Sequence, residues 1–198
     1  AIASPATARF VGLGNFAAFS PDAAEIVTSD DTRLILQAAQ TGAVLVDPLD
    51  PGGTMPDFSP DGASLVFARG TPTYTCSVSG SVASCSGKPG VAFAGLRRMQ
   101  RTPAGWEPST ALIDYDGTLG NYYPAFSPGG DWIVFNRSTT ESYNAADASI
   151  WMISADGATG PIELARATGP DAASWPKVAP FGQTLAGEPI FWITFTSR

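Results

Sequence analysis

Short apolar segments of four or five residues recur along the chain, each bounded by turns rich in Pro, Gly and Asp. The most regular of them are rich in β-branched and aromatic side chains, and they cover residues 25–28, 64–67, 132–135 and 192–195. Segments of this length and composition, separated by turn residues, are typical of β-strands. The pattern therefore predicts an all-β protein.

One turn recurs in front of these segments. Its copies are Phe19-Ser-Pro21, Phe58-Ser-Pro60, Phe126-Ser-Pro128 and the diverged Val178-Ala-Pro180. Pro presets φ for the second position of a type I turn, and a following Gly adopts the left-handed conformation. Gly62 and Gly130 supply that residue in two copies, whereas the first copy has Ala23, at a cost of about 1 kcal/mol.

The repeat period identifies the architecture. The turn prolines, at positions 21, 60, 128 and 180, are 39, 68 and 52 residues apart, which indicates a unit of about 40 residues with insertions. A third strand is predicted at 33–37, 96–100 and 149–153, and a fourth at 43–46, 110–113 and 161–164. Four antiparallel strands per unit are typical of a β-propeller blade. A β-sandwich is not expected to repeat one turn at the same place in every unit.

We therefore predict a single propeller domain over residues 1–198, with three complete blades and a half blade. The blades cover about 15–46, 54–113 and 121–165, and the half blade covers about 174–198.

Three motifs resemble a known family. They are Phe58-Ser-Pro-Asp-Gly62, the strand Ile150-Trp-Met-Ile153 and the turn Ala155-Asp-Gly157. Together they are similar to the WD40-like PD40 repeats of TolB-like propellers, over about residues 15–198. The resemblance implies a scaffold for protein partners in an envelope or extracellular setting. The chain departs from the family pattern at Ala23 and at Ala179-Pro-Phe181, where the turn is expected to differ and the next strand to begin after residue 187.

The number of strands is too small for the usual ring. The fourth unit ends after its second strand, and residues 1–12 could supply one outer strand at 7–11. Two interpretations stay open. The chain is part of a larger propeller whose remaining blades are lost, cleaved or on another chain, which the greater blade number of family members favours. Alternatively, the N-terminal strand closes a small four-bladed ring. An open ring exposes strand edges, so something must complete it.

Two insertions fall between the second and third strands of their blades, at 69–95 and 138–147. Loops on one face of a rigid scaffold often carry binding specificity, but tolerated surface insertions fit equally well. The first insertion holds Cys76 and Cys85 in a small, polar segment, where we expect a disulfide that closes a hairpin-like loop. A disulfide implies an oxidising compartment, and hence a periplasmic or extracellular protein. A metal site at these cysteines is not expected, because the chain has no His and no further Cys.

Composition and charge exclude several classes of partner. Hydrophobic residues make up 44% of the chain and charged ones 15%, with 21 Gly and 17 Pro, as suits a folded all-β protein. The net charge of -7 disfavours binding to nucleic acid and to anionic membranes. No segment has the ~20 apolar residues that a membrane span needs.

No catalytic constellation is recognisable, and no cofactor is expected. Without His the Ser-His-Asp and Cys-His routes are closed. The pair Ser174 and Lys177 has a nucleophile-and-base spacing but lacks the companion motifs. The acidic pairs Asp30-Asp31 and Asp114-Tyr-Asp116 could bind a cation, although Asp is expected in turns on structural grounds alone.

Aromatic residues are the better candidates for a binding surface. Tyr122, Tyr123 and Trp175 precede the innermost strand of their blades, and Asn15 holds an equivalent place, so they are expected near one mouth of the central channel. Alternatively, these rings only pack between blades. The leading hypothesis is a non-catalytic, exported binding module. The alternatives are a propeller domain of a larger hydrolase, similar to the prolyl oligopeptidase group, with its catalytic domain elsewhere, and a cation- or sugar-binding module.

Overall fold

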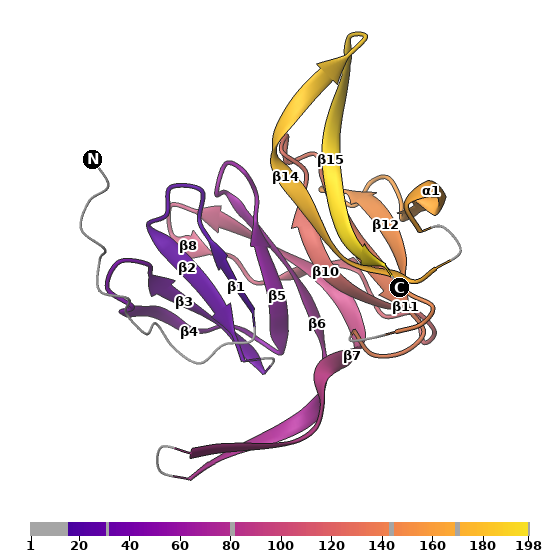
Figure 1. The fold of residues 1–198 in the computed structure, drawn as a ribbon. Helices are drawn as coiled ribbons and strands as arrows, with labels where there is room; N and C mark the ends of the chain where they lie inside the picture. The colour runs from indigo at the N-terminus through magenta and orange to yellow at the C-terminus, as the bar shows by residue number, and fades with distance from the viewer. Residues whose placement is uncertain (1–15, 31, 80–81, 143–144, 169–170, 198) are drawn as a thin grey trace, which may run out of the picture.

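The computed structural model describes residues 16–30, 32–79, 82–142, 145–168 and 171–197. It is built almost wholly of antiparallel strands, arranged as separate sheets around a common axis (Figure 1). Three sheets contain four or more strands and the last contains two. The predicted fold class, a partial propeller of antiparallel blades, is confirmed.

The sheets follow one another in chain order. The first contains β1 (Phe16–Phe19), β2 (Glu25–Ser29), β3 (Arg33–Ala38) and β4 (Val44–Pro51). The second contains β5 (Gly53–Phe58), β6 (Ser64–Ser79), β7 (Val82–Thr102) and β8 (Gly105–Trp106), with β9 (Thr110–Ile113) also paired to β7. The third contains β10 (Gly120–Phe126), β11 (Trp132–Ser138), β12 (Ser149–Ser154) and β13 (Ile162–Glu163). The short helix α1 (Ala165–Thr168) leads to β14 (Ala173–Leu185) and β15 (Glu188–Ser197), which form a half blade.

Side chains close the recurring turn. In the first copy the Ser20 hydroxyl donates to the Asp22 carboxylate at 2.6 Å and accepts from the Glu25 amide at 2.9 Å. Ser59 makes the matching bonds in the second copy, to Asp61 at 2.5 Å and from the Ser64 amide at 2.8 Å. These bonds give the Ser and Asp of the motif a structural role.

Two departures from the repeat have the expected consequences. Ala23 adopts a φ of 56° where Gly62 has 70°. In the fourth copy Ala179 has no hydroxyl to close the turn, and β14 continues as a strand through this segment to Leu185. Ala186 and Gly187, both at positive φ, make the turn instead. The hairpin β14–β15 therefore extends beyond the body on the side where the other turns lie (Figure 1).

The core lies between neighbouring sheets. Leu65 and Phe67 of β6 pack with the first sheet, whereas Val66 and Ala68 of the same strand pack with the third. A strand covered on both faces must be apolar throughout, which explains its unbroken run of hydrophobic residues. A third cluster joins the third sheet to the half blade through Val134.

The first insertion is a paired arm. It prolongs β6 and β7 into a long hairpin that projects from the body (Figure 1). The strand register places Cys76 directly opposite Cys85. Opposite residues of antiparallel strands have Cα atoms about 4.5 to 5.5 Å apart, within the range that a disulfide spans. The disulfide itself stays a prediction.

Among the described residues, no helix has the length and apolar character that crossing a bilayer requires.

Candidate functional site

The innermost strands bring one repeat position together at the axis. This position is three residues before the aromatic or Val residue that begins each recurring turn. It is held by Phe16 in β1, Met55 in β5, Tyr123 in β10 and Trp175 in β14. The Phe16 ring lies 5.8 Å from that of Tyr123 and 6.2 Å from that of Trp175, both edge-on. The rings of Tyr123 and Trp175 stack at 5.1 Å. We call these four residues the axial cluster.

A β-bulge places three of these side chains. Met55, Tyr123 and Trp175 have φ of 54°, 52° and 55°, and the strand register shifts at each of them. In each case a Pro follows and has no N–H to donate to the ladder, whereas Phe16 is followed by Ala17 and pairs regularly. A bulky residue at positive φ costs on the order of 1 to 3 kcal/mol, and such strain is concentrated at functional sites.

The expected binding residues have different environments. Tyr123 is buried, as is Met55 beside it in the axial cluster, but Trp175 is 42% exposed and presents the cluster to solvent. Tyr122 is fully buried instead, with its hydroxyl donating to the Thr140 carbonyl at 2.8 Å, so it supports the second insertion from within the core. Asn15 lies outside the described residues.

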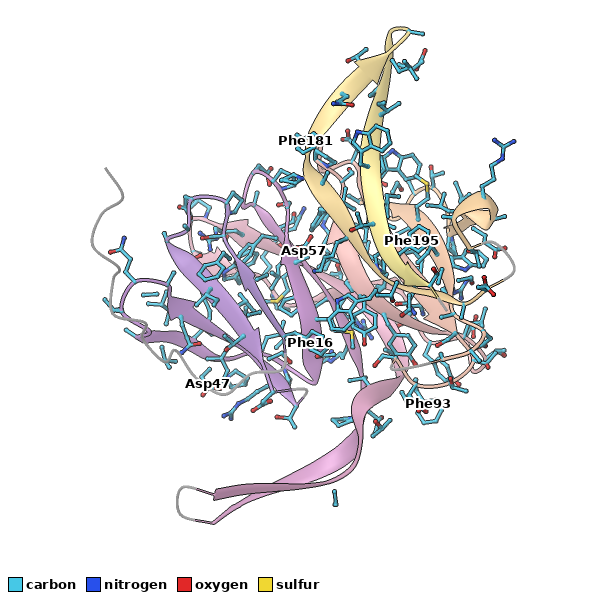
Figure 2. The ribbon with its side chains drawn as sticks, in the orientation of Figure 1. Phe16, Asp47, Asp57, Phe93, Phe181 and Phe195 are labelled. Carbon is cyan, nitrogen blue, oxygen red and sulfur yellow. The ribbon has the colours of Figure 1, made fainter. Side chains whose placement is uncertain are left out.

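In two of the innermost strands, a charged residue stands two positions after the residue of the axial cluster. Asp57 of β5 and Lys177 of β14 occupy the same repeat position, where the other two innermost strands have Ala18 and Ala125. The Asp57 carboxylate accepts the Phe126 amide hydrogen at 2.8 Å. Burial raises the pKa of Asp57 to about 6, against the smaller opposing effects of this hydrogen bond and of the Lys177 charge. Figure 2 shows Asp57 near the middle of the body, with Phe16 on the side of the arm. Asp57 is a residue that the sequence analysis missed.

Asp57 predicts a pH dependence of stability. Its pKa is about 6 in the folded protein, against 3.8 for an ordinary Asp carboxyl. Between pH 4 and pH 6 the folded state therefore binds this proton more tightly than the unfolded state does. Stability therefore falls as pH rises from 4 to 6, on the order of 1 to 2 kcal/mol for this partly buried group. Asp57→Asn should remove that part of the fall in urea titrations compared at pH 4 and pH 7. Unchanged pH dependence in the variant would show that Asp57 ionises normally.

The arm lies on the same side of the body as Phe16 of the axial cluster (Figure 2). Near its base Phe93 is 58% exposed, with a φ of 57°, and its ring lies 5.4 Å from that of Tyr115. This face therefore carries a second exposed aromatic group.

The described acidic turn residues already have partners. Asp30 accepts backbone amides from Thr32 and Arg33. Asp114 lies 3.2 Å from the Arg97 guanidinium. Asp116 accepts from the Leu119 amide at 2.7 Å and pairs with Arg137 at 3.1 Å. Asp31 lies outside the described residues. Within the described ranges, no three acidic or Cys side chains gather as a metal site would require.

Comparison with known proteins identifies the fold. No family model matches the chain, and no curated protein matches it. TolB from Acinetobacter baumannii is similar in structure, with a TM-score of 0.53 and 16% identity over 91% of this chain and 40% of that one. A protein assigned as TolB in Agrobacterium tumefaciens has a TM-score of 0.42 at 16% identity, covering 96% of this chain and 73% of that one. Hydrazine synthase from Kuenenia stuttgartiensis has a TM-score of 0.37 at 16% identity, covering 79% of this chain and 50% of that one.

The first of these likenesses carries the conclusion. The chain has a TolB-like propeller fold and spans 40% of the length of the Acinetobacter baumannii structure. At 16% identity this likeness describes the fold alone.

Proposed function

We propose that this chain is a non-catalytic, exported propeller module that binds a protein partner through the face carrying the axial cluster. The observation that supports it is the exposed Trp175 ring, stacked on Tyr123 and held on a strained backbone. Trp and Tyr are enriched among the residues that dominate protein–protein binding energy. Local strain of this kind is retained where the surrounding fold enforces it, often at a binding site.

The arm and the second insertion extend the proposed surface. The arm base exposes Phe93 beside Tyr115, and the second insertion is supported by the buried Tyr122. A rigid aromatic centre surrounded by projecting segments is suited to a protein surface more than to a small molecule, which needs an enclosed pocket. The opposed cysteines of the arm support export, because their disulfide would persist only in an oxidising compartment.

A capture experiment with matched variants tests the proposal. The chain is immobilised and exposed to an envelope extract of its native source, and the captured protein is identified, purified and titrated by calorimetry. Trp175→Ala should weaken its binding by about 30-fold, the effect of losing a central aromatic contact of about 2 kcal/mol. Trp132→Ala is the matched control, because Trp132 lies at the turn end of β11, away from the axial cluster. Equal affinity of the wild type and Trp175→Ala would contradict the proposal.

A further inference from the structure

Two aromatic rings meet on the surface where the arm joins the body (Figure 2). Phe93 of β7 is 58% exposed, and its ring lies 5.4 Å from that of Tyr115, with the two ring planes tilted by 57°. We propose that this pair binds a glycan, by stacking against the apolar faces of its pyranose rings. The inference does not depend on protein binding at the axial cluster, because the two aromatic groups come from different strands.

A β-bulge exposes Phe93. Phe93 and Ala94 together lie opposite the single residue Gly70 of β6. A Cβ on Gly70 would stand 2.5 Å from the Ala92 carbonyl oxygen, so the bulge needs glycine at this position. Phe93 has a φ of 57°, which a bulky residue adopts only where the surrounding structure enforces it. The backbone of the arm base therefore holds this ring in the solvent under strain.

Close packing of a loop places the second ring. Tyr115 follows β9, and its loop lies directly on β7, where a Cβ on Gly95 would stand 3.3 Å from the Tyr115 amide nitrogen. The next residue, Asp116, accepts two backbone amides of the same loop at 2.7 and 2.8 Å. Both rings are thus positioned before any ligand arrives, which reduces the entropy lost on binding.

The second insertion supports the other flank of Phe93. The Ser142 amide donates to the Val91 carbonyl at 2.8 Å, and the Ser142 hydroxyl accepts the Val91 amide hydrogen at 3.1 Å. Both residues are buried. These bonds join β7 to the third sheet two residues before Phe93. The aromatic pair therefore stands on a joint between two sheets of four or more strands.

The charges of the loop favour a neutral, hydroxylated ligand. Asp114 is exposed and lies 3.2 Å from Arg97, and Asp116 lies 3.1 Å from Arg137. Because each carboxylate is already paired with a guanidinium, a charged ligand would have to displace an existing partner. A purely apolar ligand would remove water from these groups without replacing its hydrogen bonds, which is costly. Hydroxyl groups can donate to a carboxylate and accept from a guanidinium, so a sugar satisfies the charged groups as well as the rings.

The open position of the rings favours a glycan chain over a free monosaccharide. Small ligands are usually bound in pockets that enclose most of their surface. Phe93 instead presents its ring to solvent, where a chain can lie across it and extend beyond the site. Sugars with equatorial hydroxyl groups have flat C–H faces that fit an aromatic ring. We therefore expect chains of glucose or N-acetylglucosamine of this geometry to bind.

An NMR titration of the backbone amides tests this assignment. The probes are cellotetraose and chitotetraose, and sorbitol is the control ligand, because it has hydroxyl groups but no ring face. At least one tetrasaccharide should bind with a dissociation constant of about 1 mM and shift the signals of residues 92–95 and 113–116. Sorbitol should give no saturable shift.

Variants at Phe93 separate ring stacking from general apolar contact. Phe93→Leu keeps an apolar side chain but removes the ring, and it should raise the dissociation constant at least about tenfold, whereas Phe93→Trp should preserve binding. Phe19→Leu is the matched control, because Phe19 is 60% exposed on the first sheet, and it should leave binding unchanged.

Three results would overturn the proposal. They are no saturable shift with either tetrasaccharide up to about 20 mM, equal affinity of the wild type and Phe93→Leu, and shifts confined to residues outside the aromatic pair and its loop. Trp175→Ala should leave tetrasaccharide binding unchanged while it weakens binding of the captured protein, so failure of one proposal is distinguishable from failure of the other. If Phe93→Leu weakened the captured protein and no tetrasaccharide bound, the ring pair would serve the protein partner instead.

Discussion

Replacing Phe135 by Ala should lower the free energy of unfolding by about 3 to 5 kcal/mol. Phe135 lies on β11 with no exposed surface, in the cluster that joins the second and third sheets. Its removal leaves a cavity between two sheets whose strands are paired on both sides, so the surrounding structure has little freedom to collapse into it. A urea titration monitored by Trp fluorescence measures the loss.

Phe19→Ala is the matched control for this effect. Phe19 ends β1 and is 60% exposed, so its truncation removes little buried surface and should cost no more than about 0.5 kcal/mol. Similar losses in both variants would mean that the interface between the second and third sheets contributes no more to stability than the surface does.

Gly95→Ala should lower the unfolding free energy by about 2 to 3 kcal/mol, or the melting temperature by roughly 4 to 12 °C. A Cβ at this position would stand 2.6 Å from the Ile113 carbonyl oxygen and 3.3 Å from the Tyr115 amide nitrogen. Both are backbone atoms of β9 and the loop after it, which cannot yield as a flexible side chain would. Differential scanning calorimetry measures the shift.

Gly182→Ala makes the same chemical change in open surroundings. The nearest atom to its added Cβ is the Ile190 carbonyl oxygen at 3.7 Å, an ordinary contact. Its melting temperature should therefore stay close to that of the wild type. If Gly95→Ala melted as the wild type does, β9 would have to move away from β7 at little cost, and the close packing of the second sheet would be refuted.

The expectation for the fourth turn shows how far local sequence reaches. The loss of Ser at Ala179 and of Asp at Phe181 was enough to predict a different turn, and the structure continues β14 through this segment. The site of the replacement turn, at Ala186 and Gly187, also follows from local conformational preference. The Cys arm was expected only as a hairpin-like loop, because its small polar residues give a weak strand signal.

The axial cluster shows where sequence reasoning stopped. Tyr122 and Tyr123 were equal candidates and both are buried, yet Tyr122 directs its hydroxyl to the second insertion and Tyr123 joins the axial rings. Neighbouring residues point to opposite faces of a strand, and a bulge changes that alternation at one point. A signal was present in the dipeptides Met55-Pro, Tyr123-Pro and Trp175-Pro, which recur where the bulges lie. Asp57 had a signal too, as the one charged residue of β5.

The sequence by itself determined the class of fold and the repeating unit, because turn chemistry and short apolar strands are local properties that a period makes visible. Tertiary structure decided which rings meet at the axis and that Asp57 is half-buried, with a raised pKa. Those features depend on how separate sheets approach one another, and the packing between blades is set by contacts distant in sequence. The aromatic-Ser-Pro turn therefore specifies a propeller, while the surface proposed for binding arises only from its assembly.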